Sequence, residues 1–277
     1  MLPFHAQKGG VLVSGMTLKW IALVLMFLDH LGEFFPQTIP VWFRWLGRLS
    51  ATLFLFCLAQ GMEKTRSRRR YLTRLGVGSA VMGAGDLLLT LWFPQAPVAV
   101  TNNIFSTMVV IGLSIWVLES FDDNCTRTDR LTRPEAALGL LVGSQVALGL
   151  LGSFIEKTAG KPWAKLLAGI LPNASYCEGG LDVVILGLIL YFTRKKPKKL
   201  CLGYGLYSAA QLIFSVSRAM GYGEFSMIFR YFYQWMMIGS LPLMLCYNGK
   251  RGRGSGKFFY LFYPAHIWLL FVLSNLK

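Results

Sequence analysis

About nine apolar segments, each close to the length that crosses a lipid bilayer, run through this chain. A spanning helix needs about 20 mostly apolar residues, because each residue advances about 1.5 Å and lipid offers the backbone no hydrogen-bond partner. The sequence therefore predicts an all-α, polytopic membrane helix bundle of about nine transmembrane helices, within a range of about eight to ten. We expect one membrane domain over residues 1–277. The segments cover residues 18–36, 40–62, 71–93, 103–119, 134–154, 177–193, 200–217, 225–247 and 258–275.

The composition excludes two other classes of protein. Hydrophobic residues make up 54% of the chain and charged residues only 15%, whereas a soluble domain carries about 25% charged residues. The net charge of +15 would suit a nucleic-acid binder, but such a protein would not be this apolar. We expect membrane lipids as neighbours, no nucleic-acid partner, and a multi-pass protein of the inner or plasma membrane.

The lysines and arginines are divided unevenly between alternate connections. Of the 28, twenty lie in the N-terminal segment and in residues 63–74, 119–133, 194–199 and 248–257, and five lie in the intervening connections or at the C-terminus. Cytoplasmic loops carry the excess of cations in membrane proteins. The N-terminus is therefore predicted to be cytoplasmic. A further apolar stretch, Trp163 to Leu171, is too short to span and would be re-entrant or interfacial.

Charged groups inside a predicted span cost free energy unless they are paired, and they therefore indicate function. The first segment carries Asp29, His30 and Glu33, at spacings that share a helix face. A histidine beside a carboxylate has the parts of a general base and its orienting group. The second segment carries Arg44 and Arg48, and we expect Arg48 to pair with Asp29 or Glu33. The alternative is that all these groups are structural ion pairs.

Other charged groups fall inside or near later segments. Glu178 and Asp182 are predicted to share a helix face near the outer end of the sixth span. Tyr263 and His266 lie in the last span, where His266 would be an alternative base or a helix-end anchor. Asp86 and Arg230 are interpreted as structural ion-pair members.

The basic connection after the second segment holds Arg66, Arg68, Arg69, Arg70 and Arg74. It is interpreted either as a topology signal at an anionic leaflet or as a phosphate-binding mouth, since guanidinium forks suit phosphates. CoA, which carries several phosphates, would be a natural occupant. The five cysteines show no CxxC spacing, and we expect no metal site.

Four short motifs, Asp29-His30, Gly47-Arg48, Asn248-Gly249 and Tyr263-Pro264 followed by His266, resemble those of the TraX family. The resemblance runs from about Thr17 to Ser274 and is looser over about residues 120–172. The best-known activity in this family is acetylation of the conjugative pilin at its N-terminus.

The resemblance implies an acetyl-CoA-dependent N- or O-acyltransferase that acts on a peptide N-terminus or an envelope sugar. It implies that His30 is the catalytic residue, with Asp29 and Glu33 beside it. The expected CoA-binding residues are Arg44, Arg48, Arg66, Arg70, Tyr71 and Arg74, and the expected acceptor-binding residues are Glu178, Asp182, Tyr263 and His266.

Two rival functions stay open. Intramembrane Asp, Glu, Arg and His residues would also suit a proton-coupled secondary transporter, although the sequence shows no pair of matching halves. A non-catalytic assembly protein is the third class, but it has no use for a buried histidine and carboxylate cluster.

Overall fold

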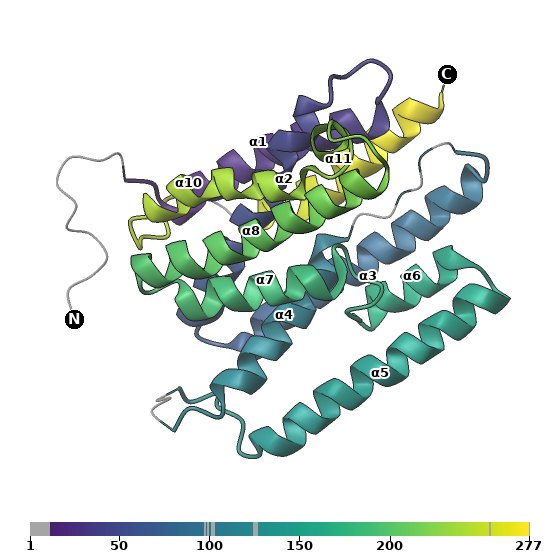
Figure 1. The fold of residues 1–277 in the computed structure, drawn as a ribbon. Coiled ribbons are helices and arrows are strands. Elements are labelled where there is room, and N and C mark those ends of the chain that lie inside the picture. Colours follow the sequence, from purple (N-terminus) through teal and green to yellow (C-terminus); the bar gives the residue numbers. More distant parts are fainter. Residues whose placement is uncertain are drawn as a thin grey trace. The chain divides into compact units, whose positions relative to one another are not determined.

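The computed structural model describes residues 12–96, 98, 100, 103–123, 127–254 and 256–276. Within these residues the chain is helical, and the sole extended pairing is an isolated bridge between Val13 and Tyr247 (Figure 1). The prediction of an all-α fold is confirmed. Lys8, Cys125 and Lys277, which entered the counts of cations and cysteines above, lie outside the described residues.

The helices follow one another with short connections. They are α1 (Gly15–Phe34), α2 (Trp42–Lys64), α3 (Arg68–Trp92), α4 (Ile104–Glu119), α5 (Pro134–Thr158), α6 (Lys161–Ile170), α7 (Gly180–Thr193), α8 (Pro197–Gly221), α9 (Met227–Arg230), the 3₁₀ helix η1 (Tyr233–Ser240), α10 (Leu241–Leu245) and α11 (Lys257–Asn275). Side-chain caps begin three of them, because the hydroxyl or amide oxygens of Ser14, Ser67 and Asn103 each accept a first-turn N–H.

Five described helices are long and apolar enough to cross a membrane, namely α1, α3, α5, α8 and α11. Helices α4 and α7 are apolar but shorter. These helices mark the chain as a membrane protein.

The segment at 225–247 is not the continuous spanning helix that the sequence predicts. It forms α9, η1 and α10 in succession. Pro242 is one cause, since proline has no N–H to continue a helix and instead favours the first turn of the next one. The short apolar stretch from Trp163 to Leu171 falls largely within a helix of 10 residues, α6, and its re-entrant or interfacial placement stays a prediction.

The chain divides into two compact units. The first comprises Met1–Cys57 and Ile189–His266, and the second comprises Leu58–Leu188 and Ile267–Lys277. The prediction of a single membrane domain stays a prediction.

The first unit is held together by buried hydroxyl bonds between helices. Ser50 of α2 donates to the Ala22 carbonyl of α1 at 2.7 Å. Ser240 joins α2 to α8, because its hydroxyl lies 2.9 Å from the hydroxyls of both Thr52 and Tyr204. Inside lipid such bonds satisfy polar groups that have no water to reach.

The second unit is built on close contact between α3 and α6. A β-carbon on Gly83 would lie 3.2 Å from Cα of Gly169, and one on Gly169 would lie 3.0 Å from Cα of Gly83. Small residues let two helix backbones approach this closely. Helix α6 also packs beside α5, so the chain folds back on itself between them (Figure 1).

Candidate functional site

Four charged side chains of α1 and α2 form a paired cluster in the first unit. Arg44 Nη1 lies 2.8 Å from Oδ1 of Asp29 and 2.8 Å from Oε2 of Glu33. Arg48 Nη2 lies 2.9 Å from Oδ2 of Asp29. The expected pairing of Arg48 with Asp29 is present, and Arg44 adds a bridge between both carboxylates. Two positive and two negative groups therefore neutralise each other.

The cluster depends on a close approach of α2 to α1. A β-carbon on Gly47 would lie 2.0 Å from Cγ of Asp29 and 2.3 Å from its Cβ. The approach at Gly32 is less close, because a β-carbon there would lie 3.1 Å from Cδ of Arg44. These two glycines place the charged groups of both helices within ion-pairing distance.

The 3₁₀ helix η1 contributes two polar contacts that the sequence reasoning missed. Arg44 Nε lies 3.4 Å from the Tyr233 hydroxyl, and Arg48 Nη1 donates to Oε1 of Gln234 at 3.2 Å. The Arg48 guanidinium also lies 5.7 Å from the centroid of the Tyr233 ring. A run of eight residues in a 3₁₀ helix is longer than usual.

Beside this cluster, His30 of α1 meets His266 of α11. Nδ1 of His30 and Nε2 of His266 are 2.8 Å apart, and both side chains are buried. Tyr263 is also buried, and its ring centroid lies 6.5 Å from that of His30. The structure therefore brings together His30, Tyr263 and His266 from opposite ends of the sequence.

Asp29, His30 and Glu33 each offer an atom within 4.8 Å of the others, a grouping that resembles a metal-ligand set. The guanidinium groups of Arg44 and Arg48 already occupy both carboxylates. Two neighbouring positive charges oppose a bound cation. This environment suits a charge-balancing role for the carboxylates better than a metal site.

The basic connection lies in the second unit and exposes most of its cations. Arg66 precedes α3, and Arg70 and Arg74 are four residues apart near its N-terminus, all three exposed. Tyr71 is half-buried, and the Arg74 guanidinium lies 5.9 Å from its ring centroid. The expected CoA-binding residues therefore fall in both units, with Arg44 and Arg48 in the first and the other four in the second.

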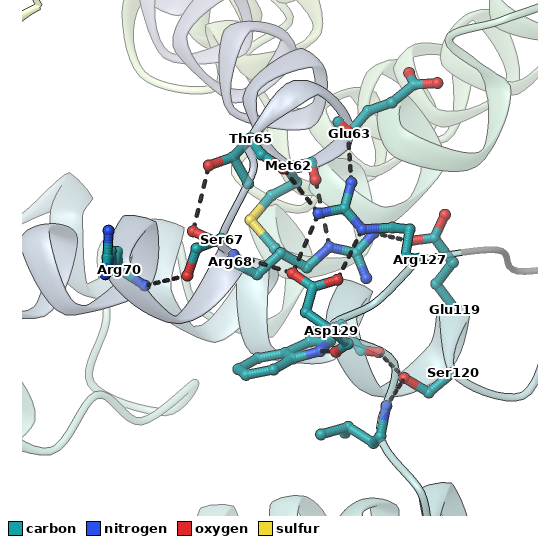
Figure 2. Close-up of polar contacts among 12 residues, drawn as sticks. Met62, Glu63, Thr65, Ser67, Arg68, Arg70, Glu119, Ser120, Arg127 and Asp129 are labelled. Atoms are coloured by element: carbon teal, nitrogen blue, oxygen red, sulfur yellow. Dashed lines mark hydrogen bonds and ion pairs between the residues drawn. The ribbon is translucent and has the colours of Figure 1, made fainter.

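Arg68, in contrast, is fully buried and belongs to a polar network under this connection (Figure 2). It forms an ion pair with Glu119, its backbone N–H donates to Asp129, and its Nε donates to the Met62 carbonyl. Arg127 completes the network by binding the carbonyls of residues 63 and 65 and the Asp129 carboxylate. The network ties the 62–68 connection to the 127–131 loop.

Asp129 shows the electrostatic consequence. The hydrogen bond from the Arg127 guanidinium holds the pKa of the Asp129 carboxyl below its ordinary value, against a smaller opposing effect of burial. The carboxylate is therefore charged throughout the neutral range and stays paired with the Arg127 guanidinium.

The two acidic residues expected to share a helix face do not do so. Helix α7 begins at Gly180, so Asp182 lies exposed in its first turn and Glu178 lies in the turn before it. Gly179 and Gly180 have φ of +76° and +61°, values incompatible with a right-handed helix. The predicted same-face arrangement is therefore wrong, although the two residues remain near in sequence.

The remaining charged candidates have local partners. Asp86 in α3 accepts a hydrogen bond of 3.0 Å from Nε1 of Trp268. Arg230 lies 3.7 Å from Glu224, and both side chains are exposed. Arg230 is therefore a member of an ion pair as expected, whereas the partner described for Asp86 is an indole N–H and not a charged group.

Comparison with known proteins adds the family. The model of the family described as "TraX protein" matches residues 14–274. The chain is also 27% identical over 272 residues to the probable fimbrial assembly protein FimC, serogroup H1, of Dichelobacter nodosus, covering 93% of this chain and 94% of that protein. No solved structure matches the chain. Because the family model covers nearly all of the sequence, including every residue of the charged cluster and both buried histidines, the chain belongs to the TraX protein family.

Proposed function

We propose that this chain is a membrane-embedded acyltransferase that moves an acetyl group from cytoplasmic acetyl-CoA to an amine or hydroxyl of an acceptor. The observation that carries the proposal is the buried His30, hydrogen-bonded to a second histidine and adjacent to a neutralised group of carboxylates and arginines. A purely structural ion-pair cluster has no need for two buried imidazoles. A general base does need an imidazole held in a fixed orientation.

In the proposed reaction, His30 removes the proton of the acceptor amine or hydroxyl. The acceptor atom then forms a bond to the thioester carbonyl carbon, and the carbon–sulfur bond of acetyl-CoA breaks. The imidazolium returns the proton to the departing CoA thiolate. Base catalysis of this kind contributes about 10²–10⁴-fold to a rate.

The tetrahedral intermediate carries a negative oxygen that needs a hydrogen-bond donor. Tyr263 is the first candidate donor, since its ring and that of His30 are both buried and their centroids are 6.5 Å apart. Arg48 is the second candidate, because Asp29 holds its guanidinium beside the same helix turn. Arg44 bridges both carboxylates and serves to keep them in place.

CoA is proposed to bind through its phosphates to Arg66, Arg70 and Arg74, whose side chains are exposed at the start of α3. Tyr71 lies among them. The cation distribution supports a cytoplasmic N-terminus, which places this connection on the side where acetyl-CoA is found. Counting α2, α4, α7 and the α9–η1–α10 segment as crossings gives about nine spans in an inner or plasma membrane.

The acceptor is proposed to be a pilin-like peptide N-terminus or an envelope sugar. A similar protein is named for fimbrial assembly, which favours a peptide of a surface fibre. Asp182 is exposed at the start of α7, and Glu178 precedes it, so carboxylates there would attract a cationic amine.

The test is acetyl transfer in proteoliposomes, using labelled acetyl-CoA with pilin-derived peptides and amino sugars. His30→Ala should lower the rate at least about 100-fold. The matched control is His5→Ala, which removes a histidine that precedes the first span and should leave the rate unchanged. Wild-type transfer by His30→Ala would show that His30 is not the base.

The same samples separate this proposal from a proton-coupled transporter. Acetyl-CoA should raise the thermal midpoint of the detergent-solubilised protein, because a ligand that binds only the folded state stabilises it. A transporter of unrelated substrates should show no such rise. Failure of both transfer and stabilisation would overturn the acyltransferase proposal.

A further inference from the structure

His30 and His266 form a direct ring-to-ring hydrogen bond that the spacing of the sequence gives no reason to expect. The two residues are 236 positions apart, and Nδ1 of His30 lies 2.8 Å from Nε2 of His266. One of these nitrogens must donate and the other accept, so the contact makes the tautomer of each ring depend on that of the other.

A second contact decides which nitrogen donates. Nδ1 of His266 lies 2.7 Å from the backbone carbonyl of Phe262, one helical turn earlier in α11. A carbonyl oxygen can only accept, so Nδ1 of His266 carries the proton. With both rings neutral, Nε2 of His266 is then an acceptor, and Nδ1 of His30 must donate to it. Nε2 of His30 is left as the basic nitrogen.

Packing holds His266 in the orientation that these two hydrogen bonds require. Its ring is stacked on Phe262, with centroids 4.8 Å apart and an interplanar angle of 14°. The Tyr263 ring meets it edge-on at 5.9 Å. With its side chain 5% exposed, His266 has little room to turn over and exchange the positions of its two nitrogens.

We infer that His266 is the positioning residue for His30. The Phe262 carbonyl fixes the tautomer of His266, and His266 in turn fixes the tautomer of His30 and directs its basic Nε2 toward the acceptor. This inference rests on the proposed function for the role of His30 as base. It assigns the orienting task to His266 rather than to Asp29 or Glu33, whose carboxylates are paired with Arg44 and Arg48. It also changes the role of His266 from acceptor binding to orientation.

His266 resembles the orienting group of other base-catalysed sites. In those sites a second group fixes the tautomer and ring angle of the histidine that moves the proton. The partner here is a neutral imidazole held by a carbonyl, not a carboxylate. A neutral partner suits a site where the surrounding charges already balance.

The tautomers are directly measurable because the chain has only three histidines. The experiment is ¹⁵N NMR of full-length protein labelled at histidine and reconstituted in lipid, with His5→Ala, His30→Ala and His266→Gln used for assignment. We expect His30 and His266 both to be protonated at Nδ1, with a ¹⁵N–¹⁵N coupling between Nδ1 of His30 and Nε2 of His266. An Nε2-protonated His30, or no coupling, would overturn the inference whatever the activity.

Two substitutions extend the test to the reaction. The oxygen of His266→Gln can reach the position of Nε2 and accept the His30 proton, so this variant should keep the His30 tautomer and stay within about 10-fold of the wild-type kcat. His266→Phe keeps a ring but removes the acceptor, so kcat should fall about 100-fold while KM for acetyl-CoA is unchanged. Equal activity of the two variants would overturn the positioning role.

The outcomes separate this inference from the proposed function. If His30→Ala is inactive and His266→Phe is fully active, the positioning role is wrong and the base assignment stands. If the ¹⁵N coupling is present but His30→Ala transfers acetyl at the wild-type rate, His30 is not the base. The hydrogen bond between His30 and His266 then has no catalytic role. Thermal midpoints measured for each variant show whether a loss of activity reflects unfolding, and the wild-type NMR result does not depend on any substitution.

Discussion

Gly47 of α2 faces Asp29 of α1 so closely that a β-carbon on Gly47 would lie 2.0 Å from the carboxyl carbon. No side chain fits into this space without moving Asp29, and Asp29 is held by two guanidinium groups. The absence of a side chain at one position therefore sets the geometry of the whole charged cluster.

Gly47→Ala should consequently destabilise the protein by about 1–3 kcal/mol, the usual cost of overpacking. Acetyl transfer should fall on the order of 100-fold, because displacement of a site residue by about 1 Å has that effect. Gly205→Ala in α8 is the matched control, since a β-carbon there meets no atom within 4 Å. Thermal unfolding in detergent measures the stability of both variants, and the acetyl-transfer assay measures their activity. Similar midpoints for Gly47→Ala and Gly205→Ala would contradict the prediction.

Removal of Arg44 should cost more stability than removal of Arg48. Arg44 bridges Asp29 and Glu33, whereas the carboxylate left behind by Arg48→Gln still has Arg44 as a partner. Arg44→Gln leaves Glu33 without this guanidinium, and for a part-buried pair such a loss costs about 1.5–3 kcal/mol. Arg44→Gln should show a loss of that order in denaturant unfolding, and the opposite ranking of the two variants would be inconsistent with this pairing.

The exposed arginines of the basic connection should govern affinity for acetyl-CoA and not the chemical step. A triple variant, Arg66→Gln, Arg70→Gln and Arg74→Gln, should raise KM for acetyl-CoA about 10–100-fold with kcat unchanged, since each charged hydrogen bond contributes about 1.5–3 kcal/mol before solvent screening reduces it. The control triple, Lys196→Gln, Lys198→Gln and Lys199→Gln, removes the same charge from exposed residues elsewhere. A similar KM for the two triple variants would indicate that the basic connection acts as a topology signal alone.

The buried Arg68 depends on Glu119, and this pair differs in kind from the surface pairs nearby. Glu119→Gln should lower stability by about 3–5 kcal/mol, because the Arg68 charge would stay buried without its carboxylate. Asp123→Asn is a matched control in the same connection, where Arg130 pairs with a carboxylate side chain that is 96% exposed. That variant should be nearly neutral. A small effect of Glu119→Gln on the thermal midpoint would argue against this network as an anchor.

Acidification should weaken the same network at Asp129. The Arg127 hydrogen bond lowers the folded-state pKa of Asp129, so the pair stabilises the fold fully above the ordinary carboxyl pKa of about 3.9. That contribution disappears as the pH falls through the lowered folded-state value. The difference in thermal midpoint between wild type and Asp129→Asn should therefore shrink between about pH 6 and about pH 3. A difference that grows on acidification would have the wrong sign.

The helical fold and the local pairing were predictable from sequence, whereas the long-range partners were not. Apolar runs specify helices, and four-residue spacing places Arg44 and Arg48 on one face opposite Asp29. Nothing in a local pattern links His30 to a residue 236 positions away. The same limit applies to Gln234 of the 3₁₀ helix η1, which contacts Arg48 from 186 positions away.

Burial also separates arginines that look alike in the sequence. Arg68 and Arg70 stand two positions apart in one basic run, yet the first is fully buried and the second is exposed. A helix turns about 200° over two residues, so neighbouring cations face opposite sides. Which side faces the 127–131 loop depends on tertiary packing, and composition alone therefore treats a structural arginine and a candidate ligand as the same signal.

The balance of charge between α1 and α2 has a consequence for how the protein is made. In the proposed topology both helices cross the bilayer, and each helix alone would bring two uncompensated charges into it, at about 2.5–3.5 kcal/mol for each one near the centre. As a hairpin the two helices enter with those charges cancelled. In that topology the first two segments would enter the membrane as one unit, because the carboxylates of α1 find their guanidinium partners on α2.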